Sequence, residues 1–424
     1  MIKNVKQTFF IILTFFIMIL MAELLIQIVC LISIDMKDIV FPYKKAPLYL
    51  QDKVLGHRPN PLFFEHDKNG FRNIVIPKTI DIVAMGDSQT YGIGVRIDKA
   101  WPQQLQSMSK LNVYNMAFGG YGPAHYLLLI EEACKLNPKL IIVAMYSGND
   151  LYDGFHLVYD KNILFNMKTS NNKIMNSINQ LENIETLDEK SYRTGDRVSP
   201  KKQNKKDHKY HNNNSQCIEL RYFFANNCGI YGFLRALKNL KYYQYNTKQL
   251  SWRTIRGEYE IKSNIYQILD DNKFNIVFMA PYRLGALDLN DIRLKEGLRI
   301  QKESILRINH ILKNRNIKFL VLIIPTTEYV FFEYINMKQY SMKPVYYELI
   351  RAEQDFMGNI FNFLNKESIP SINTVHALRN CLIQGKQPYP MNPDGHPNEH
   401  GYNEIAKEVY KYIINHTDLC LSIK

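Results

Sequence analysis

Apolar strand-like runs alternate with helix-like runs over much of the chain between residues 80 and 150. Ile80–Met85 and Leu140–Met145 are short and mostly apolar, and turn-forming residues follow each of them, as expected for buried parallel strands. Between them, Trp101–Met108 and Ala124–Leu136 have helical spacing, and Val113–Ala117 is a further candidate strand. Since strand and helix alternate, the pattern predicts βαβ units in a doubly wound parallel sheet.

The same alternation returns near the carboxyl terminus, after a long interruption. We expect an amphipathic helix over Asp291–Lys313, an apolar strand over Phe319–Ile324, a short strand near Ile372 and a last helix over Tyr402–Ile414. Residues 152–315 are therefore interpreted as an insertion that forms a cap or subdomain. Residues 152 to about 216 are polar, and the latter part of this stretch is predicted to be mobile. Residues 217–270 regain helical spacing, and 275–279 resemble a strand.

The amino-terminal segment is the most apolar part of the sequence. Phe9–Ile34 is long enough, as a helix, to cross a hydrocarbon layer of ~30 Å, and Glu23 and Gln27 are its strongly polar interruptions. No small-x-small cleavage pattern follows it, which favours an uncleaved transmembrane anchor over residues 1–34. Lys3 and Lys6 precede the run, as expected for a cytoplasmic amino terminus, but Lys37, Lys44 and Lys45 follow it. The expected orientation, with the rest of the chain periplasmic or extracellular, therefore rests mainly on the position of the run.

Turn-forming residues dominate the stretch that follows this anchor. Residues 35–78 contain Pro42, Gly56, Pro59 and Gly70 but little periodicity, so they are interpreted as an extended stalk and lead-in. We expect the main body to occupy residues 79–424.

Composition narrows the functional classes without choosing among them. The formal net charge is +13, but the basic residues are scattered and cluster most densely in Lys201–Lys209, so we expect no nucleic-acid binding. An attraction to anionic lipid or polysaccharide would suit this charge. The six cysteines lack the paired spacing of a zinc site, and we expect neither a metal nor a cofactor. Outside the cytoplasm, Cys217 and Cys228 are close enough in sequence to form a disulfide.

A candidate nucleophile stands at the end of the first predicted strand. Gly86-Asp87-Ser88 occupies the place where open α/β sheets put their reactive groups, although the tripeptide alone is an ordinary turn. The motif is not the Gly-x-Ser-x-Gly elbow of α/β-hydrolases, because Gln89-Thr90 follow the serine. Ser88 therefore needs a base, an orienting group and oxyanion donors from elsewhere in the chain.

Three later blocks can supply those groups. Gly120 follows the second strand with an unobstructed backbone N–H, and Asn149 follows the third with a side-chain amide. Asp394 and His396 share a tight loop before the last helix, where they offer a carboxylate and an imidazole.

With these four blocks in this order, the chain resembles the SGNH, or GDSL-type, hydrolase superfamily. The resemblance covers roughly residues 79–150 and 316–416, and it implies a three-layer α/β/α, flavodoxin-like fold. It implies that Ser88 is the nucleophile, that Gly120 and Asn149 join the Ser88 N–H as oxyanion donors, and that His396 is the base with Asp394 as its partner. The lead-in Asn69-Gly70-Phe71-Arg72 also looks like that of bacterial membrane-anchored members.

One departure from the common pattern lies in the last block. The usual Asp-x-x-His spacing would place an aspartate at 393, but the residue there is Pro393, and Asp394 stands two positions before His396. This Asp-x-His spacing resembles branches of the superfamily that include alginate O-acetylation proteins.

The resemblance implies an extracytoplasmic serine esterase, or an O-acyltransferase that works through an acyl-serine on a carbohydrate. An acyltransferase could work with a membrane acyltransferase as partner. The sequence leaves two alternatives open, namely a lipid esterase or lysophospholipase and a non-catalytic polysaccharide-binding or assembly protein. Other polar residues near the motifs have structural interpretations: Asp87 and Asp150 as loop braces, Thr326 as a helix cap, and His125, His156 and His400 as structural or surface groups.

Overall fold

The computed structural model describes residues 2–32, 36, 40, 47–63, 65–184, 228–238 and 251–416. The chain divides into two compact units, which are described separately here. The N-terminal unit comprises Met1–Pro47 and Ser199–Ser251, and the sheet unit comprises Leu48–Val198 and Trp252–Lys424.

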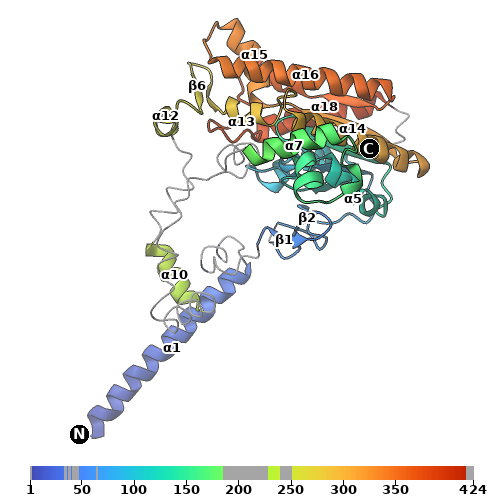
Figure 1. Ribbon diagram of the computed structural model, residues 1–424. Coiled ribbons are helices and arrows are strands. Elements are labelled where there is room, and N and C mark those ends of the chain that lie inside the picture. The colour runs from blue at the N-terminus through green and yellow to red at the C-terminus, as the bar shows by residue number, and fades with distance from the viewer. Residues whose placement is uncertain are drawn as a thin grey trace. The chain divides into compact units, whose positions relative to one another are not determined.

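The sheet unit is built on five parallel strands (Figure 1). The strands are β3 (Ile82–Gly86), β4 (Val113–Ala117), β5 (Leu140–Tyr146), β8 (Lys318–Ile324) and β9 (Ser371–Asn373). They lie in the order β4-β3-β5-β8-β9, which is the 2-1-3-4-5 order of a flavodoxin-like sheet. The predicted fold class is confirmed, and the chain reverses direction across the sheet at β3, the strand that leads to Ser88.

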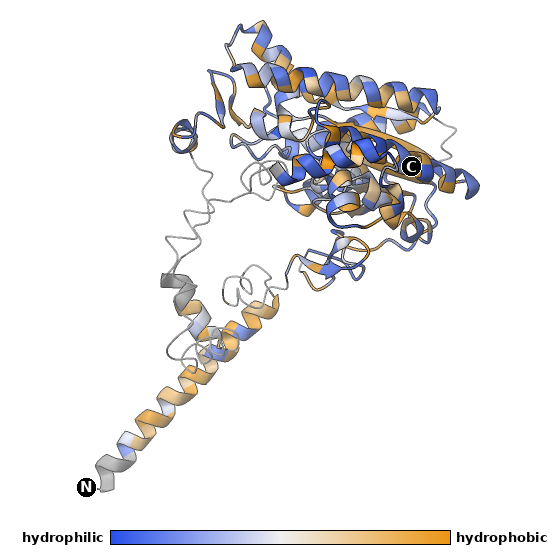
Figure 2. Cartoon of the chain, in the orientation of Figure 1, coloured by the Kyte–Doolittle hydropathy of each residue, from blue (hydrophilic) through white to orange (hydrophobic). Residues whose placement is uncertain are grey.

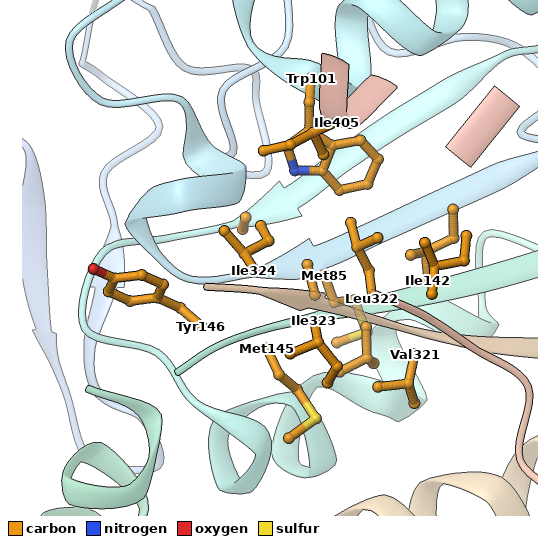
Figure 3. Close-up of a cluster of buried hydrophobic side chains, with 14 of the residues drawn as sticks. Met85, Trp101, Ile142, Met145, Tyr146, Val321, Leu322, Ile323, Ile324 and Ile405 are labelled. Atoms are coloured by element: carbon orange, nitrogen blue, oxygen red, sulfur yellow. The ribbon is translucent and has the colours of Figure 1, made fainter. Parts of the chain in front are cut away.

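Continuous burial explains why these runs form central strands. Every residue of β3, β4 and β5 is buried, so both faces of each strand are covered by helices. Figure 3 shows Met85, Ile142, Leu322 and Ile323 from neighbouring strands in one apolar cluster. Trp101, on the first residue of a helix, is fully buried in the same core.

Helices cover the sheet in two layers. On one side α5 (Pro123–Cys134) packs against α14 (Ile292–Asn314), and Lys302 of α14 lies over Phe363 of α16 (Pro344–Lys366). On the other side α4 (Trp101–Ser109) packs against α18 (Glu399–Asn415).

Shorter elements connect these layers. They are β1 (Tyr49–Asp52), β2 (Gly56–Pro59), α3 (Ser88–Tyr91), η2 (Ile97–Lys99), α6 (Asp150–Phe155), η3 (His156–Asp160), η4 (Phe165–Met167), α7 (Asn172–Ile184), α12 (Trp252–Glu260), β6 (Gln267–Asp270), β7 (Asn275–Phe278), α13 (Ala280–Gly285), α15 (Thr327–Met337) and α17 (Val375–Ile383).

The predicted helices and strands of the sheet are confirmed to within a few residues. The 23-residue helix α16 was not predicted, although its buried face contributes nine residues to the interior. The long helix α14 packs on α5 and α6 as part of the layered core, so the carboxyl-terminal end of the predicted insertion belongs to the sheet's own architecture. Residues 185–227 and 239–250 of that insertion lie outside the described residues.

The expectation of an extended stalk is wrong for residues 48–78. Phe71, Arg72 and Asn73 are buried in the sheet unit. The Arg72 guanidinium donates to the carbonyl oxygens of Gly92 (2.6 Å) and Val95 (2.9 Å), just after the turn that bears Ser88. Proline and glycine mark turns in this segment, as expected, but Phe71, Arg72 and Asn73 pack into the rest of the sheet unit.

The N-terminal unit contains α1 (Ile2–Ile32) and α10 (Gly229–Lys238). Within α1, Gln7–Ile32 is long and apolar enough to cross a membrane, which is compatible with an anchor or a signal sequence. Figure 2 shows this helix apolar along most of its length. Glu23 accepts hydrogen bonds from the backbone N–H groups of Gly229 (2.6 Å) and Ile230 (2.8 Å), so it caps α10. Cys217, one partner of the predicted disulfide, lies outside the described residues.

Candidate active site

Ser88 is presented by a tight turn at the carboxyl end of β3. Asp87 caps the short helix α3, because its Oδ1 accepts the backbone N–H of Gln89 at 2.9 Å. The following residues form a short helix that leads away from the strand, and Ser88 is half-buried at the sheet edge. The loops after β4 and β5 leave the same edge on either side of it, since both strands pair parallel with β3.

His396 and Asp394 meet Ser88 in a continuous hydrogen-bonded chain. The His396 Nε2 lies 2.8 Å from the Ser88 Oγ, and the His396 Nδ1 lies 3.1 Å from the Asp394 Oδ1. Asp394 can hold only a protonated Nδ1, so it selects the tautomer whose Nε2 accepts the serine proton. Ser88 lies more than 300 positions before His396 in the sequence. Together with Asp394, the two side chains have the contacts expected of a nucleophile, a base and an orienting carboxylate.

Gly395 is what allows the short Asp-x-His spacing to work. It has φ +77°, a left-handed conformation that turns the chain sharply between Asp394 and His396. Arg283 supports the turn from outside by donating to the Asp394 carbonyl oxygen at 3.2 Å. Gln89, next to the nucleophile, supports it from inside with a bond to the Gly395 carbonyl oxygen at 3.3 Å. Nothing in the local sequence pattern marks Arg283 or Gln89 for this task.

Three hydrogen-bond donors at the sheet edge that bears Ser88 have no acceptor among the described residues. They are the backbone N–H of Ser88, the backbone N–H of Gly120 and the side-chain amide of Asn149. Asn149 begins helix α6, yet its side chain does not cap that helix. Unused donors at the end of a parallel sheet, beside a serine bonded to a histidine, are the arrangement that an oxyanion requires.

Comparisons with known proteins found similarity only among solved structures. No family model matches the chain, and no curated protein matches it. Among solved structures, it is similar to a member of the lipolytic protein G-D-S-L family from Veillonella parvula, at 9% identity and a TM-score of 0.33, over 79% of this chain and 99% of that one. It is also similar to a GDSL-like lipase from Bacteroides thetaiotaomicron, at 10% identity and a TM-score of 0.31, over 81% of this chain and 92% of that one. Since these TM-scores are low, the site is judged on its own geometry.

We expect Gly395→Ala to damage activity far more than stability. A Cβ there would lie 2.3 Å from the Arg283 Nη2, and the left-handed backbone would be strained by roughly 1–2 kcal/mol. The loop must then shift, and a displacement of about 1 Å can cost ~10²-fold in turnover. Steady-state kinetics and a thermal melt measure the two effects separately.

Gly385→Ala is the matched control for this variant. Gly385 has φ +76°, but its added Cβ would meet only the flexible Lys273 side chain, at 3.3 Å. Gly385→Ala should lose about as much stability through backbone strain as Gly395→Ala, and its turnover should be unchanged. Equal turnover losses in the two variants would contradict a specific role for the Gly395 turn.

Several buried carboxyl groups lie behind the nucleophile. Burial raises the pKa of Asp87 to about 6, and burial together with the neighbouring Asp87 raises the pKa of Asp150 and Asp153 well above their usual range. Asp150 accepts the Tyr146 backbone N–H at 3.0 Å, and Asp87 caps α3, so both brace loops. Positive charge on His396 lowers the pKa of Asp87, which couples this carboxyl group electrostatically to the base.

Glu353, on α16, ties two loops of the sheet edge together. Its carboxylate accepts the Ser147 hydroxyl at 2.5 Å and the Thr326 backbone N–H at 2.8 Å, and Ser147 is two residues before Asn149. Thr326 caps helix α15 with its hydroxyl group. Burial raises the pKa of Glu353 to about 7. This residue was not singled out in the sequence, because it lies in the interior of an amphipathic helix.

The raised pKa of Glu353 predicts a pH-dependent stability. The folded protein binds the Glu353 proton more tightly than the unfolded chain does, so this proton stabilises the fold. The stabilisation is fully present below the unfolded pKa of about 4.3 and is lost as pH rises through 7. The difference in the free energy of unfolding amounts to about 4 kcal/mol. Glu353→Gln should abolish this contribution, and the exposed Glu348→Gln on the same helix should not. Urea unfolding at pH 5 and pH 8 checks it; parallel pH profiles for the wild type and Glu353→Gln would contradict it.

His125, His156 and His400 make no hydrogen bond to Ser88, His396 or Asp394. His125 is buried, and its Nδ1 accepts the Gly122 backbone N–H at 3.1 Å. His156 lies 2.7 Å from the Asp160 carboxylate, and His400 is exposed in the first turn of α18.

Proposed function

We propose that this chain is a serine ester hydrolase or O-acyltransferase that works through an acyl-Ser88 intermediate. The observation that carries the proposal is the 2.8 Å contact between the His396 Nε2 and the Ser88 Oγ, with Asp394 on the other ring nitrogen. The unused donors at Ser88, Gly120 and Asn149 supply the complementary feature, a place for negative charge.

The proposed reaction has two halves. In the first, His396 takes the Ser88 proton as the Oγ bonds to the ester carbonyl carbon, and the three donors hold the resulting oxyanion. The oxyanion then collapses, the ester C–O bond breaks, and the leaving alcohol takes the proton from His396. In the second half, water or a sugar hydroxyl gives its proton to His396 and attacks the acyl group, and Ser88 regains its proton when it leaves.

The proposed substrate is an O-acetyl ester of a carbohydrate outside the cytoplasm. The proposal draws on the apolar helix α1, taken as an uncleaved anchor, and on the Asp-x-His spacing, whose geometry Gly395 makes possible. A net charge of +13 suits an anionic polymer near a membrane surface. We propose a cytoplasmic amino terminus, the orientation expected for an apolar run in this position with Lys3 and Lys6 before it, although Lys37, Lys44 and Lys45 follow it.

The test uses the full chain in detergent micelles with an activated acetyl ester, with and without an oligosaccharide acceptor. A covalent acetyl group found by mass spectrometry on the peptide that contains Ser88 would support the proposal. Release of acetate alone would then identify an esterase, and acetylated oligosaccharide would identify a transferase. Neither turnover nor an acyl adduct with several acyl esters would overturn catalysis and favour a binding protein.

A further inference from the structure

The Gly119–Gly120 peptide is held from the side opposite to Ser88 by a residue of the lead-in segment. His57, in strand β2, places its Nε2 3.0 Å from the Gly119 carbonyl oxygen. On the other side, a Cβ added at Gly119 would lie 3.7 Å from the Ser88 Cβ. The peptide therefore lies between the nucleophile and this histidine ring.

Carbonyl and N–H of one peptide group point in opposite directions. The Gly119 carbonyl and the Gly120 N–H belong to the same planar trans unit, since no described peptide bond is cis. With the carbonyl turned to His57, the Gly120 N–H faces away from it. That N–H is one of the donors without an acceptor among the described residues.

Two consecutive glycines give this peptide little intrinsic preference for one orientation. Gly120 has φ +76°, and with no side chain at either position the peptide plane can rotate at small cost. A hydrogen bond to its carbonyl is the direct way to select one orientation. An added Cβ at Gly120 would also meet the His57 ring at 3.6 Å, so ring and peptide are already in contact.

The surroundings of His57 suit a fixed donor. Its ring contacts Tyr49, Phe118 and Tyr121, with ring centroids 5.2–5.6 Å away, and the Tyr121 hydroxyl donates to the His57 carbonyl oxygen at 2.7 Å. Burial lowers the pKa of His57, which favours the neutral ring. Because a carbonyl oxygen only accepts, the proton of that neutral ring is on Nε2, and this nitrogen is not available as a base.

We propose that His57 is a positioning residue for acyl transfer, which orients and polarises the Gly119–Gly120 peptide so that the Gly120 N–H donates to the oxyanion. The inference rests on the proposed function, because it assigns a purpose to that donor. The polarisation follows from hydrogen-bond cooperativity: a peptide whose carbonyl accepts a bond becomes a stronger donor at its N–H. His57 thus acts through the peptide and does not touch the substrate's reacting atoms.

The test compares His57→Gln with His57→Met, two unbranched side chains of similar length of which only glutamine has a donor. His57→Met should lower kcat by about 10- to 100-fold. This loss is no larger than the loss expected when an oxyanion donor is removed. KM should stay within about twofold of the wild-type value. Affinity for a boronic acid that forms a tetrahedral adduct on Ser88 should fall by the same factor. His57→Gln should recover most of both losses.

His310→Met is the control for histidine loss, because His310 is exposed on α14 and its ring lies 3.4 Å from the Asn314 side chain of the same helix. It should leave kcat near the wild-type value. Equal kcat in the Gln and Met variants overturns the inference, and if Ser88→Ala is still inactive the proposed function survives that failure.

A measurement on the unmutated protein does not depend on how the variants fold. Formation of the boronate adduct should move the His57 Nε2–H proton resonance downfield, because the Gly119 carbonyl becomes a stronger acceptor when the Gly120 N–H is engaged. An unchanged resonance in a fully formed adduct also overturns the inference.

Discussion

Ser88→Ala should lower ester turnover by roughly 10⁴- to 10⁶-fold, because no acyl-enzyme can form without the Oγ. The fold should survive, since the half-buried hydroxyl bonds only His396 at 2.8 Å and Asp87 at 3.3 Å. We expect the free energy of unfolding to change by about 1 kcal/mol at most. Initial rates with an activated acetyl ester, together with circular dichroism and a urea titration, measure both quantities.

Ser107→Ala is the control for this experiment. Ser107 lies on α4 and bonds the Gln103 carbonyl of its own helix at 3.0 Å, so it has no contact with the hydrogen-bonded chain of the site. It should retain full turnover. A Ser88→Ala protein with a tenth or more of the wild-type rate would rule out Ser88 as the nucleophile.

His396→Ala should have an effect of nearly the same size. In the proposed mechanism the imidazole both takes the Ser88 proton and returns it to the leaving group, so the two residues would act as one unit. For this reason the Ser88→Ala/His396→Ala double variant should lose no more than about tenfold beyond either single variant. Independent effects that multiply in the double variant would show that the two side chains do not work together.

His400→Ala separates the role of His396 from a general effect of histidine loss. His400 lies four positions later, exposed on the first turn of α18, and its backbone N–H bonds the Asn398 side chain. Truncation of its side chain leaves that cap in place. Turnover should stay within about twofold of the wild type, as is usual for an exposed side chain without such contacts.

The loops of the site are held by side chains that take no part in the proposed reaction. The loop that bears Asn149 is tied by Ser147 to Glu353, and the loop that bears His396 is tied by Arg283 and Gln89. These contacts explain why the sheet edge can present unsatisfied donors in one arrangement. For the same reason the two variants should have different effects. Gly395→Ala should mainly lower turnover, and Glu353→Gln should mainly change the pH dependence of stability.

The sequence by itself determined the parallel sheet and the identity of the motif residues. Mostly apolar runs at Ile82–Gly86, Val113–Ala117 and Leu140–Tyr146 are typical of strands that are buried on both faces in a covered parallel sheet. Carboxyl ends of neighbouring parallel strands meet at one edge, so the residues after them could be expected near Ser88. That reasoning is local, because it needs only the period and length of each run.

Only the tertiary structure decided which distant side chains serve that edge. Arg283 and Glu353 lie in helices, and His57 lies in a strand of the lead-in. The local sequences of these elements are ordinary amphipathic or turn-rich segments. The contact of Asp394 with His396 likewise depends on the left-handed backbone of Gly395 and on the groups that hold it. Such contacts join residues up to about 300 positions apart, and no periodicity along the chain encodes them, because they arise from how the layers pack.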